Sequence, residues 1–370
     1  MKLFLFADKL PPEIGGMETH AKYFVQYFAS KSNLYIISKK GNDDILVDND
    51  FKIARGINII EFLSSFSTEK CVVFYNSGRW IEDFDIIKGC LPLAVFIYRT
   101  GGNEIIKAPL SKLNVNSHLE RQKIWSGILN RNIDFLIANS EFTYQRLIKI
   151  GIKKEIITIL SGGIDSKNIK ESLKKRANTR LMLKCPNSIP LLVCCCRFVP
   201  YKRPQYIIQS LLHLNIPYQM VFVGNGPLLE ECMHLVKQLN LKNCTFLGEL
   251  PQQQALDIIA CADVYCQASC DLEVPVQCGK YIHTEGMGRS LLESICCGTR
   301  VVVTKCGAVN EFINNNNGIV VDGSEELFAH SIETVLSLPR ISQELRQTYI
   351  ERYNFEGIFT SYMYLWQKRF

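Results

Sequence analysis

Two glutamates separated by seven residues are the strongest chemical signal in the sequence. Glu285 and Glu293 bracket a turn with two glycines, in the segment Glu285-Gly286-Met287-Gly288-Arg289-Ser290-Leu291-Leu292-Glu293. We expect a helix to begin near Arg289, where its free N–H groups and dipole favour a phosphate. Glu293 could then reach ribose hydroxyls beside that phosphate, and Glu285 could reach a sugar on the other side. The alternative is that Glu285 is a loop acid and Glu293 only complements the helix dipole.

Three cations form a second cluster directly after an apolar run. The segment Arg197-Phe198-Val199-Pro200-Tyr201-Lys202-Arg203 follows Leu191–Cys195, which reads as a buried strand. Ligands of parallel α/β sheets bind beyond the carboxyl ends of the strands. Arg197 could neutralise a diphosphate with its planar fork, and Lys202 could do so as a point charge. A solvated loop before a helix that starts at Pro204 is the alternative.

A pair of glycines near the N-terminus is a weaker signal. The segment Pro11–His20 reads PPEIGGMETH and follows the first apolar run. Gly15 and Gly16 would let the backbone approach a ligand closely where a helix begins. The motif is not GxGxxG and lacks an acidic partner at ribose-binding spacing, so it does not support a nicotinamide site.

These segments lie within two series of alternating strands and helices. The first series predicts strands at Lys2–Phe6, Leu34–Ser38, Cys71–Tyr75, Leu93–Tyr98, Phe135–Ala138 and Ile156–Leu160. The second predicts strands at Leu191–Cys195, Gln219–Val223, Thr245–Leu247, Val264–Gln267, Arg300–Thr304 and Ile319–Val321. The helical patterns between them favour parallel sheets that are covered on both faces. The polar, Lys/Arg-rich stretch Asp165–Asn187 reads as a linker, so we place a domain boundary near residue 170.

The composition indicates two ordinary globular domains. The 370 residues are 47% hydrophobic and 21% charged, and the sequence shows neither a signal peptide nor an apolar run long enough to span a membrane. The net charge of +6 is too small for a dedicated nucleic-acid binder. Residues 99–154 hold ten basic and four acidic residues. They predict either a face for anionic lipid, with Trp125 as its anchor, or a solvated helical surface.

Taken in order, the motifs resemble the family 4 retaining glycosyltransferases, the glycosyl transferases group 1. The resemblance runs over residues 2–321 and is densest from residue 190 onward. Its motifs are GGMETH, IANSEFT (137–143), SGGID (161–165), RFVPYKR, VGNGP (223–227), FLGEL (246–250), ADVYCQAS (262–269), the two-glutamate segment and CGTRVVVTKCGAVNEFI (297–313).

The resemblance implies an α/β protein of the GT-B fold, with two Rossmann-like, doubly wound domains facing a cleft. The N-terminal, acceptor-side domain would span residues 1–170, the nucleotide-sugar domain residues 171–352, and a closing helix, residues 353–370, would return to the first domain. The donor would be a nucleotide-diphosphate sugar, with no cofactor and no metal.

The site residues follow from the matching motifs. Glu285, Arg197 and Lys202 would act in catalysis, Glu285 on the transferred sugar and the two cations on the diphosphate. Glu293 would bind the ribose. The remaining donor contacts would come from Gly16, Gly248, Gly288, Arg289, Ser290 and Leu291.

Two departures from the family pattern concern the same site. Many relatives have a histidine after the strand that matches Leu93–Tyr98, and here Arg99, Thr100 or Asn103 takes its place. His20 could contact the sugar or acceptor, or it could be a structural histidine. Fifteen residues, Cys270–Thr284, are inserted before Glu285. Their cysteines and His283 do not have the spacing of a zinc site.

We therefore expect a cytoplasmic glycosyltransferase that acts on a polysaccharide or lipid-linked saccharide precursor. Its partners would be the nucleotide sugar, the acceptor and, peripherally, the inner face of an anionic membrane, but no nucleic acid. The alternatives are a catalytically silent sugar-nucleotide-binding scaffold and another GT-B enzyme, such as a sugar-nucleotide epimerase.

Overall fold

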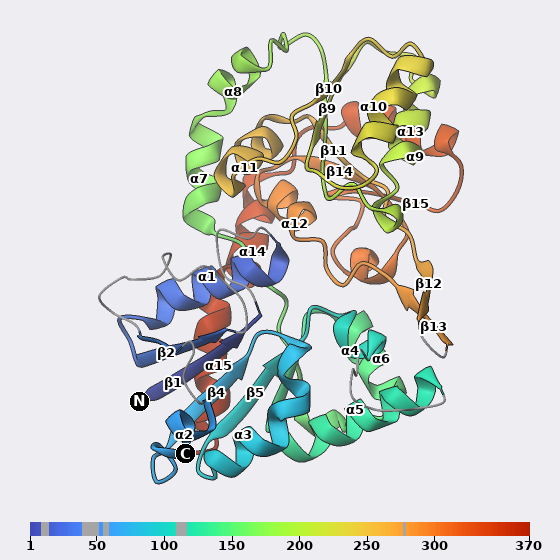
Figure 1. Ribbon diagram of the computed structural model, residues 1–370. Helices are drawn as coiled ribbons and strands as arrows, with labels where there is room; N and C mark the ends of the chain where they lie inside the picture. Colours follow the sequence, from blue (N-terminus) through green and yellow to red (C-terminus); the bar gives the residue numbers. More distant parts are fainter. Residues whose placement is uncertain (9–14, 39–51, 55–58, 109–116, 277–278) are drawn as a thin grey trace. The chain divides into compact units, whose positions relative to one another are not determined.

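The computed structural model describes residues 1–8, 15–38, 52–54, 59–108, 117–276 and 279–370. It divides into two compact units, each built around a sheet of its own (Figure 1). Unit 1 comprises Met1–Gly163, Glu273–Tyr281 and Phe355–Phe370, and unit 2 comprises Ile164–Leu272 and Ile282–Asn354. The chain passes from unit 1 to unit 2 after Gly163 and returns to unit 1 at Phe355. The sequence analysis places these two boundaries near residues 170 and 353.

Unit 1 holds a parallel sheet that is seven strands wide in the described residues, in the order β3-β2-β1-β4-β5-β6-β7. The strands are β1(Lys2–Ala7), β2(Asn33–Ser38), β3(Lys52–Ala54), β4(Cys71–Tyr75), β5(Val95–Arg99), β6(Phe135–Ala138) and β7(Ile157–Ile159). The helices are α1(Gly16–Phe28), α2(Ile59–Ser64), α3(Phe84–Cys90), α4(Glu104–Lys107), α5(His118–Asn132), α6(Glu141–Lys149) and α15(Phe355–Gln367). The strand order steps outward from β1 in both directions, which makes the sheet doubly wound.

Each face of this sheet is covered because successive residues of a buried strand point to opposite sides. Phe4 and Phe6 of β1 pack in one cluster with Trp125 of α5. Leu3 and Leu5 pack in the other, with residues of α1 and α15. The strands therefore read as continuous apolar runs, as expected for a parallel sheet buried on both faces.

Unit 2 holds a second parallel sheet, six strands wide, in the order β10-β9-β8-β11-β14-β15. Its strands are β8(Leu191–Cys195), β9(Gln219–Val223), β10(Cys244–Phe246), β11(Val264–Gln267), β14(Arg300–Thr304) and β15(Gly318–Val321). Its helices are α7(Ser166–Lys174), α8(Arg176–Met182), α9(Pro204–Ser210), α10(Leu229–Gln238), α11(Gln252–Cys261), α12(Arg289–Cys296), α13(Glu325–Leu336) and α14(Gln343–Tyr353). Apolar clusters cover both of its faces, so this sheet too is Rossmann-like.

The stretch predicted as a linker, Asp165–Asn187, is helical instead. Asp165 caps α7 by accepting hydrogen bonds from the backbone N–H groups of Lys167 and Asn168. Both α7 and α8 pack on α11. The buried surface of α7 is small, Ile169 and Ser172, and this explains why its sequence reads as polar.

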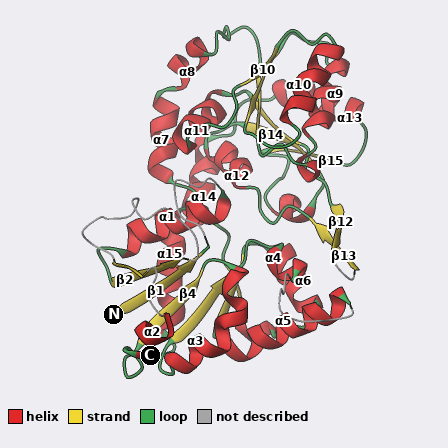
Figure 2. Ribbon diagram, in the orientation of Figure 1, coloured by secondary structure: helices red, strands yellow, loops and turns green. Residues whose placement is uncertain are grey.

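The insertion Cys270–Thr284 contains two strands, β12(Leu272–Val276) and β13(Gly279–His283), which form a separate two-stranded sheet (Figure 2). Its β12 residues alternate between half-buried and exposed positions. The sequence analysis identifies the insertion but does not predict its structure.

Candidate functional site

The carboxyl edge of the unit 2 sheet brings together the two strongest sequence signals. The loop Arg197–Arg203 follows β8, and the segment that contains Glu285 precedes α12. Two hydrogen bonds join the first loop to the residues that follow β11, one from Cys270 N–H to Tyr201 O at 2.8 Å and one from the Arg203 side chain, Nε, to Ala268 O at 2.9 Å. These contacts hold the cationic loop beside the glutamate.

Lys202 and Glu285 form an ion pair in which their side chains are only 10% and 12% exposed. Ser269 Oγ also donates to Glu285 Oε2, at 3.2 Å. Burial is the largest single influence on the pKa of Lys202 and lowers it, but the charge and hydrogen bond of Glu285, together with Tyr201 and Cys196, outweigh burial, so the net shift is upward. A nearly buried ammonium balanced by one carboxylate could transfer its interaction to a phosphate that enters the site.

The N-terminus of α12 is open to an anion. Its N-cap residue, Gly288, has a φ of 79°, a left-handed conformation that favours glycine, and no side chain caps the helix. Tyr265 holds the first turn in place, because its hydroxyl contacts Ser290 Oγ at 2.7 Å and donates to Cys195 O at 3.0 Å. Uncapped N–H groups and the helix dipole together favour a bound phosphate.

Glu293 lies one turn into α12 and is 8% exposed. Burial raises its pKa, while the charge of Arg289 and a hydrogen bond with Gln252 act in the opposite direction. Arg289 Nε is 3.8 Å from Glu293 Oε1. Keeping this carboxylate charged while it is buried therefore costs the ligand-free protein some folding stability. Such a carboxylate is suited to accept hydrogen bonds from ligand hydroxyls.

Glu293→Gln is expected to leave the free protein at least as stable as the wild type at neutral pH and to weaken donor binding. A raised pKa means that the folded protein holds this proton more tightly than the unfolded chain, so its contribution to stability is lost as pH rises above the ordinary value of 4.5. The difference in Tm, variant minus wild type, should therefore increase from about pH 4.5 to about pH 7. Thermal unfolding of both proteins across this pH range tests the prediction, and a difference in Tm that decreases as the pH rises would contradict it.

Three glycines that the sequence analysis did not assign shape the site. A Cβ on Gly224 or Gly226 would overlap the carbonyl oxygen of Cys196 or Phe198, in or next to the cationic loop. A Cβ on Gly307 would overlap the carbonyl oxygen of Glu285. The signals were present in the motifs VGNGP and CGAV, but only the fold shows which backbone segments the glycines approach.

The other two residues predicted in unit 2 lie apart from the ion pair. Arg197 is exposed, and its Nη2 donates to Tyr201 Oη at 3.1 Å. Gly248 accepts a hydrogen bond through its carbonyl oxygen from Gly224 N–H at 2.7 Å, and a Cβ there would meet open space. Arg197 is thus free to turn toward a ligand at the cost of one hydrogen bond.

The residues predicted in unit 1 lie at the carboxyl edge of its sheet or just beyond it. Gly16 is the first residue of α1, and a Cβ on it would meet nothing within 4 Å. Arg99 is the last residue of β5 and is 6% exposed. Thr100 is fully buried and its Oγ1 accepts from Gly102 N–H at 2.9 Å. Asn103 accepts from Arg146 Nη1 at 3.3 Å. Of Arg99, Thr100 and Asn103, only Arg99 ends the strand. The motif residues Pro11–Ile14 lie outside the described residues.

His20 is a core residue, in agreement with the structural role and not with a contact to sugar or acceptor. It is 1% exposed, and its Nε2 lies 3.1 Å from Tyr362 Oη of α15. Its ring stacks on Phe74 with centroids 6.0 Å apart. An aromatic enclosure of this kind leaves no room for a saccharide hydroxyl.

The predicted lipid-facing surface of residues 99–154 is also partly wrong. Trp125 is fully buried and Arg121 is 7% exposed, so neither can anchor the protein to a membrane. Arg131 is exposed but forms a bidentate ion pair with Asp85. The pairing lowers the pKa of Asp85 to about 2 through the Arg131 hydrogen bond, although burial acts in the other direction.

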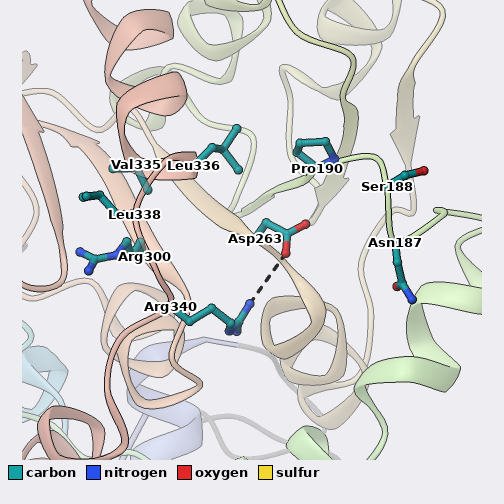
Figure 3. Close-up of a pocket in the computed structure, with 9 residues that line it drawn as sticks. All are labelled: Asn187, Ser188, Pro190, Asp263, Arg300, Val335, Leu336, Leu338 and Arg340. Atoms are coloured by element: carbon teal, nitrogen blue, oxygen red, sulfur yellow. Dashed lines mark ion pairs between the residues drawn. The ribbon is translucent and has the colours of Figure 1, made fainter.

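A pocket at the opposite, amino edge of the unit 2 sheet is structural (Figure 3). Asp263 lies between Arg340 and Arg180, at 3.9 Å and 2.8 Å. Arg340 also donates to the carbonyl oxygens of Ala262 and Cys297. Because these arginines are already supplied with acceptors, the pocket offers little to a ligand. In the parts of the chain that the structure describes, no group of His, Cys, Asp or Glu side chains is arranged to hold a metal ion.

Comparison with known proteins gives consistent matches. Residues 183–353 match the family model described as glycosyl transferases group 1. The chain is 22% identical over 341 residues, 88% of its length and 85% of the relative's, to a GDP-mannose-dependent monoacylated alpha-(1-6)-phosphatidylinositol monomannoside mannosyltransferase of Corynebacterium glutamicum. It is 26% identical over 211 residues, 56% of its length and 50% of the relative's, to a GDP-mannose-dependent alpha-(1-6)-phosphatidylinositol dimannoside mannosyltransferase of Mycobacterium tuberculosis.

The fold is shared with solved structures at lower identity. The Anabaena protein HepE in complex with UDP superposes with a TM-score of 0.80 at 15% identity, and the match covers 100% of both chains. The same protein has also been solved with UDP-glucose. Residues 183–353 thus resemble the glycosyl transferases group 1, and the chain is a nucleotide-sugar glycosyltransferase with the GT-B fold.

Proposed function

We propose that the protein transfers a sugar, with retention of configuration, from a nucleotide-diphosphate sugar to a saccharide or lipid-linked saccharide. The observation that supports this most is the buried Lys202–Glu285 pair, in the unit that also holds the uncapped N-terminus of α12. The three features supply what sugar transfer needs: a cation for the departing diphosphate, backbone N–H groups for its oxygens and a carboxylate for the sugar.

In this proposal the site acts mainly by stabilising the negative charge that develops on the departing nucleoside diphosphate. Transfer passes through an oxocarbenium-like transition state as the nucleoside diphosphate departs. Lys202 moves from Glu285 toward the diphosphate, Arg197 adds a second cation, and Glu293 binds the ribose. Glu285, released from Lys202, contacts the transferred sugar. The leaving phosphate itself takes the proton of the acceptor hydroxyl, because no other general base is assigned.

We further propose that transfer needs no metal ion. Two cations and a helix N-terminus can together offset the charge of a diphosphate. Activity that survives excess EDTA would support this, and activity that returns only when a divalent cation is added back would contradict it.

The relatives suggest the chemistry of the substrates. The two mannosyltransferase relatives are named for GDP-mannose and phosphatidylinositol mannosides, and HepE was solved with UDP-glucose. We therefore propose GDP-mannose and the UDP-hexoses as the donors to test first, and a saccharide on a phosphate-linked lipid as the acceptor class.

The test is a thermal-shift screen of nucleotide sugars, followed by transfer assays with the donors that bind. A donor at 100 times its Kd adds about 2.7 kcal/mol to the free energy of unfolding, which is readily seen as a rise in Tm. A transferase releases nucleotide faster when acceptor is added. A silent scaffold binds without release, and an epimerase interconverts the donor sugars without acceptor, so either result would replace the proposal.

We also propose contact with an anionic membrane, through α7 and α8 rather than through residues 99–154. Leu181 and Met182 are 75% and 84% exposed; Lys184 is exposed two residues after Met182, and Lys170 is exposed on α7. The α8 helix is fixed to unit 2 by the buried Arg180, which donates to Asp263 at 2.8 Å and Ile189 O at 2.8 Å. Exposed apolar side chains flanked by lysines are typical of an interfacial contact with anionic lipid. Among the described residues, no helix is long and apolar enough to cross a membrane.

Replacing both Leu181 and Met182 by serine is expected to lower binding to vesicles of phosphatidylglycerol and phosphatidylcholine at least about tenfold, because each buried side chain contributes about 1.5–3 kcal/mol. Vesicle co-sedimentation measures it. The control is Leu212→Ser, since Leu212 is also exposed, at 50%, but lies on the other side of β8 in the sequence. Equal binding of all three proteins, or binding that does not depend on anionic lipid, would contradict the proposal.

A further inference from the structure

Gln267 differs from the other buried amide side chains of the chain in what surrounds it. Each of the others that the structure describes forms at least one hydrogen bond; Asn317 donates to a backbone carbonyl and a tyrosine hydroxyl, and Asn76 donates to a backbone carbonyl. Gln267 is 1% exposed, and neither its Oε1 nor its Nε2 has a partner in the described parts of the chain. A buried amide without partners destabilises a folded protein, so its retention calls for an explanation.

The amide of Gln267 lies against the turn that leads into α12, residues 285–288. Gln267 is the last residue of β11, and the residues two positions before and after it both hold this segment. The hydroxyl of Tyr265 contacts the first turn of α12 at 2.7 Å, and Ser269 Oγ donates to the carboxylate at the start of the turn at 3.2 Å. Gln267 Nε2 is 3.6 Å from the position that a Cβ on Gly288 would occupy. Gln267 therefore faces the turn without a hydrogen bond to it.

The turn is fixed at both ends and contains two glycines. Glu285 O accepts from Ala308 N–H at 3.0 Å, and Gly288 O accepts from two N–H groups of α12 at 3.1 and 3.2 Å. Gly286 and Met287 lie between these fixed points. With a glycine on each side of Met287, the peptide units in the middle of the turn can change orientation at little steric cost.

The geometry of the peptide unit links an anion on one side of this turn to Gln267 on the other. A trans peptide unit is planar, and its N–H and C=O point in opposite directions. When N–H groups of the turn face an anion at the N-terminus of α12, their carbonyl oxygens point away from the anion, toward β11. The amide NH2 of Gln267 is a suitable donor for such a carbonyl.

We propose that Gln267 is a positioning residue for the turn of residues 285–288. When the donor's diphosphate binds at α12, the amide donates to the carbonyl oxygen of Gly286 or Met287 and holds the N–H groups of the turn toward the phosphate. The same hydrogen bond fixes the backbone that carries Glu285. The proposal rests on the proposed function in taking the anion to be a diphosphate of the donor, and Gln267 itself touches neither donor nor acceptor.

Gln267→Met tests the proposal, because methionine has a similar length and volume but no amide. Without ligand, the Tm of this variant should equal or exceed that of the wild type, since two unpaired buried polar atoms are removed. Its affinity for UDP and GDP, measured by calorimetry on the full chain, should fall at least about tenfold for each nucleotide that binds the wild type, because ordering the turn no longer gains a hydrogen bond.

Gln219→Met is the matched control. Gln219 is the first residue of β9 in the same sheet, and its Nε2 donates to Leu183 O at 2.9 Å. Its replacement removes a hydrogen bond that the ligand-free protein already has, so the Tm should fall and the nucleotide affinity should stay the same.

Backbone hydrogen exchange gives a signature that a purely structural role of Gln267 would not change. UDP or GDP at saturation should slow exchange at residues 285–288 of the wild type and of Gln219→Met, because the turn becomes ordered. In Gln267→Met, also at saturation, the slowing should be reduced at least about tenfold.

The outcomes separate this proposal from the proposed function. Unchanged nucleotide affinity in Gln267→Met overturns it, and so does a loss of Tm in the ligand-free variant as large as that of Gln219→Met, because the amide would then already be partnered. Equal slowing of exchange in Gln267→Met and the wild type also overturns it. None of these measurements needs turnover, so a protein that binds nucleotide without transferring sugar would contradict the proposed function and still decide the role of Gln267.

Discussion

Glu285→Ala is expected to lower kcat by about 100- to 1000-fold while leaving the affinity for nucleoside diphosphate unchanged or improved. In the free protein Glu285 neutralises Lys202, and the side chains are only 10% and 12% exposed. Without the carboxylate, Lys202 no longer has to give up a partner before it binds a diphosphate. The sugar, however, loses a group on which transition-state stabilisation depends, and such losses fall in this range.

The reverse substitution has the opposite signature. Lys202→Ala should weaken nucleoside diphosphate binding, because it removes a cation from the leaving group and leaves Glu285 unpaired. Each single variant leaves one buried charge uncompensated, which typically costs about 3–5 kcal/mol of stability. The double variant Lys202→Ala/Glu285→Ala should recover most of that stability but none of the activity.

Calorimetry with UDP and GDP, thermal unfolding and transfer rates on the same four proteins complete the test. Ser269→Ala is a mild control, because it removes one hydrogen bond to Glu285 at 3.2 Å and leaves the ion pair intact. If Glu285→Ala loses nucleotide affinity and turnover to the same extent, Glu285 binds the nucleotide rather than acting on the sugar. If the double variant is no more stable than the single variants, the stability lost in each single variant does not come from leaving the other charge unpaired.

An element of the fold can be predicted from the sequence when its signal lies in a short, continuous stretch of residues. Buried parallel strands appear as uninterrupted apolar runs, and Cys71–Tyr75, Gln219–Val223 and Val264–Gln267 begin and end where the sequence predicts. The half-buried, alternating β12 has no such run. The polar stretch Asp165–Asn187 reads as a linker because only two α7 residues are buried and its cap, Asp165, is itself polar.

The site shows the same division. The residues proposed to bind the donor can be predicted by motif, because glycine, cation and carboxylate each occur in a short segment of the sequence. The pairing of Lys202 with Glu285 joins residues 83 positions apart and is fixed by how β8 and β11 lie next to each other, which no local pattern records. His20 and Trp125 fail as predicted contacts because each lies in an aromatic or apolar core.

Gly307→Ala is expected to reduce kcat/KM by about 100-fold even though Gly307 has no side chain and touches no substrate. Its φ is 49°, so any side chain costs about 1–2 kcal/mol in backbone strain. A Cβ there would also overlap the carbonyl oxygen of Glu285 and lie 2.5 Å from Thr284 Oγ1. Ala308 N–H donates to that same carbonyl at 3.0 Å, so the two segments cannot separate without breaking a hydrogen bond.

The clash must therefore be relieved by moving the backbone that carries Glu285, and a shift of about 1 Å at a catalytic group is enough to cost about 100-fold in rate. Gly151→Ala separates this effect from strain alone. Gly151 also has a positive φ, of 93°, but a Cβ there would meet only Ser126 Oγ, at an ordinary 3.5 Å. Both variants should lose Tm, Gly307→Ala at least as much as Gly151→Ala because it adds the clash to the strain, and only Gly307→Ala should lose turnover. Equal activity in the two would mean that Glu285 tolerates displacement, and its assigned contact with the transferred sugar would then have to be given to another residue.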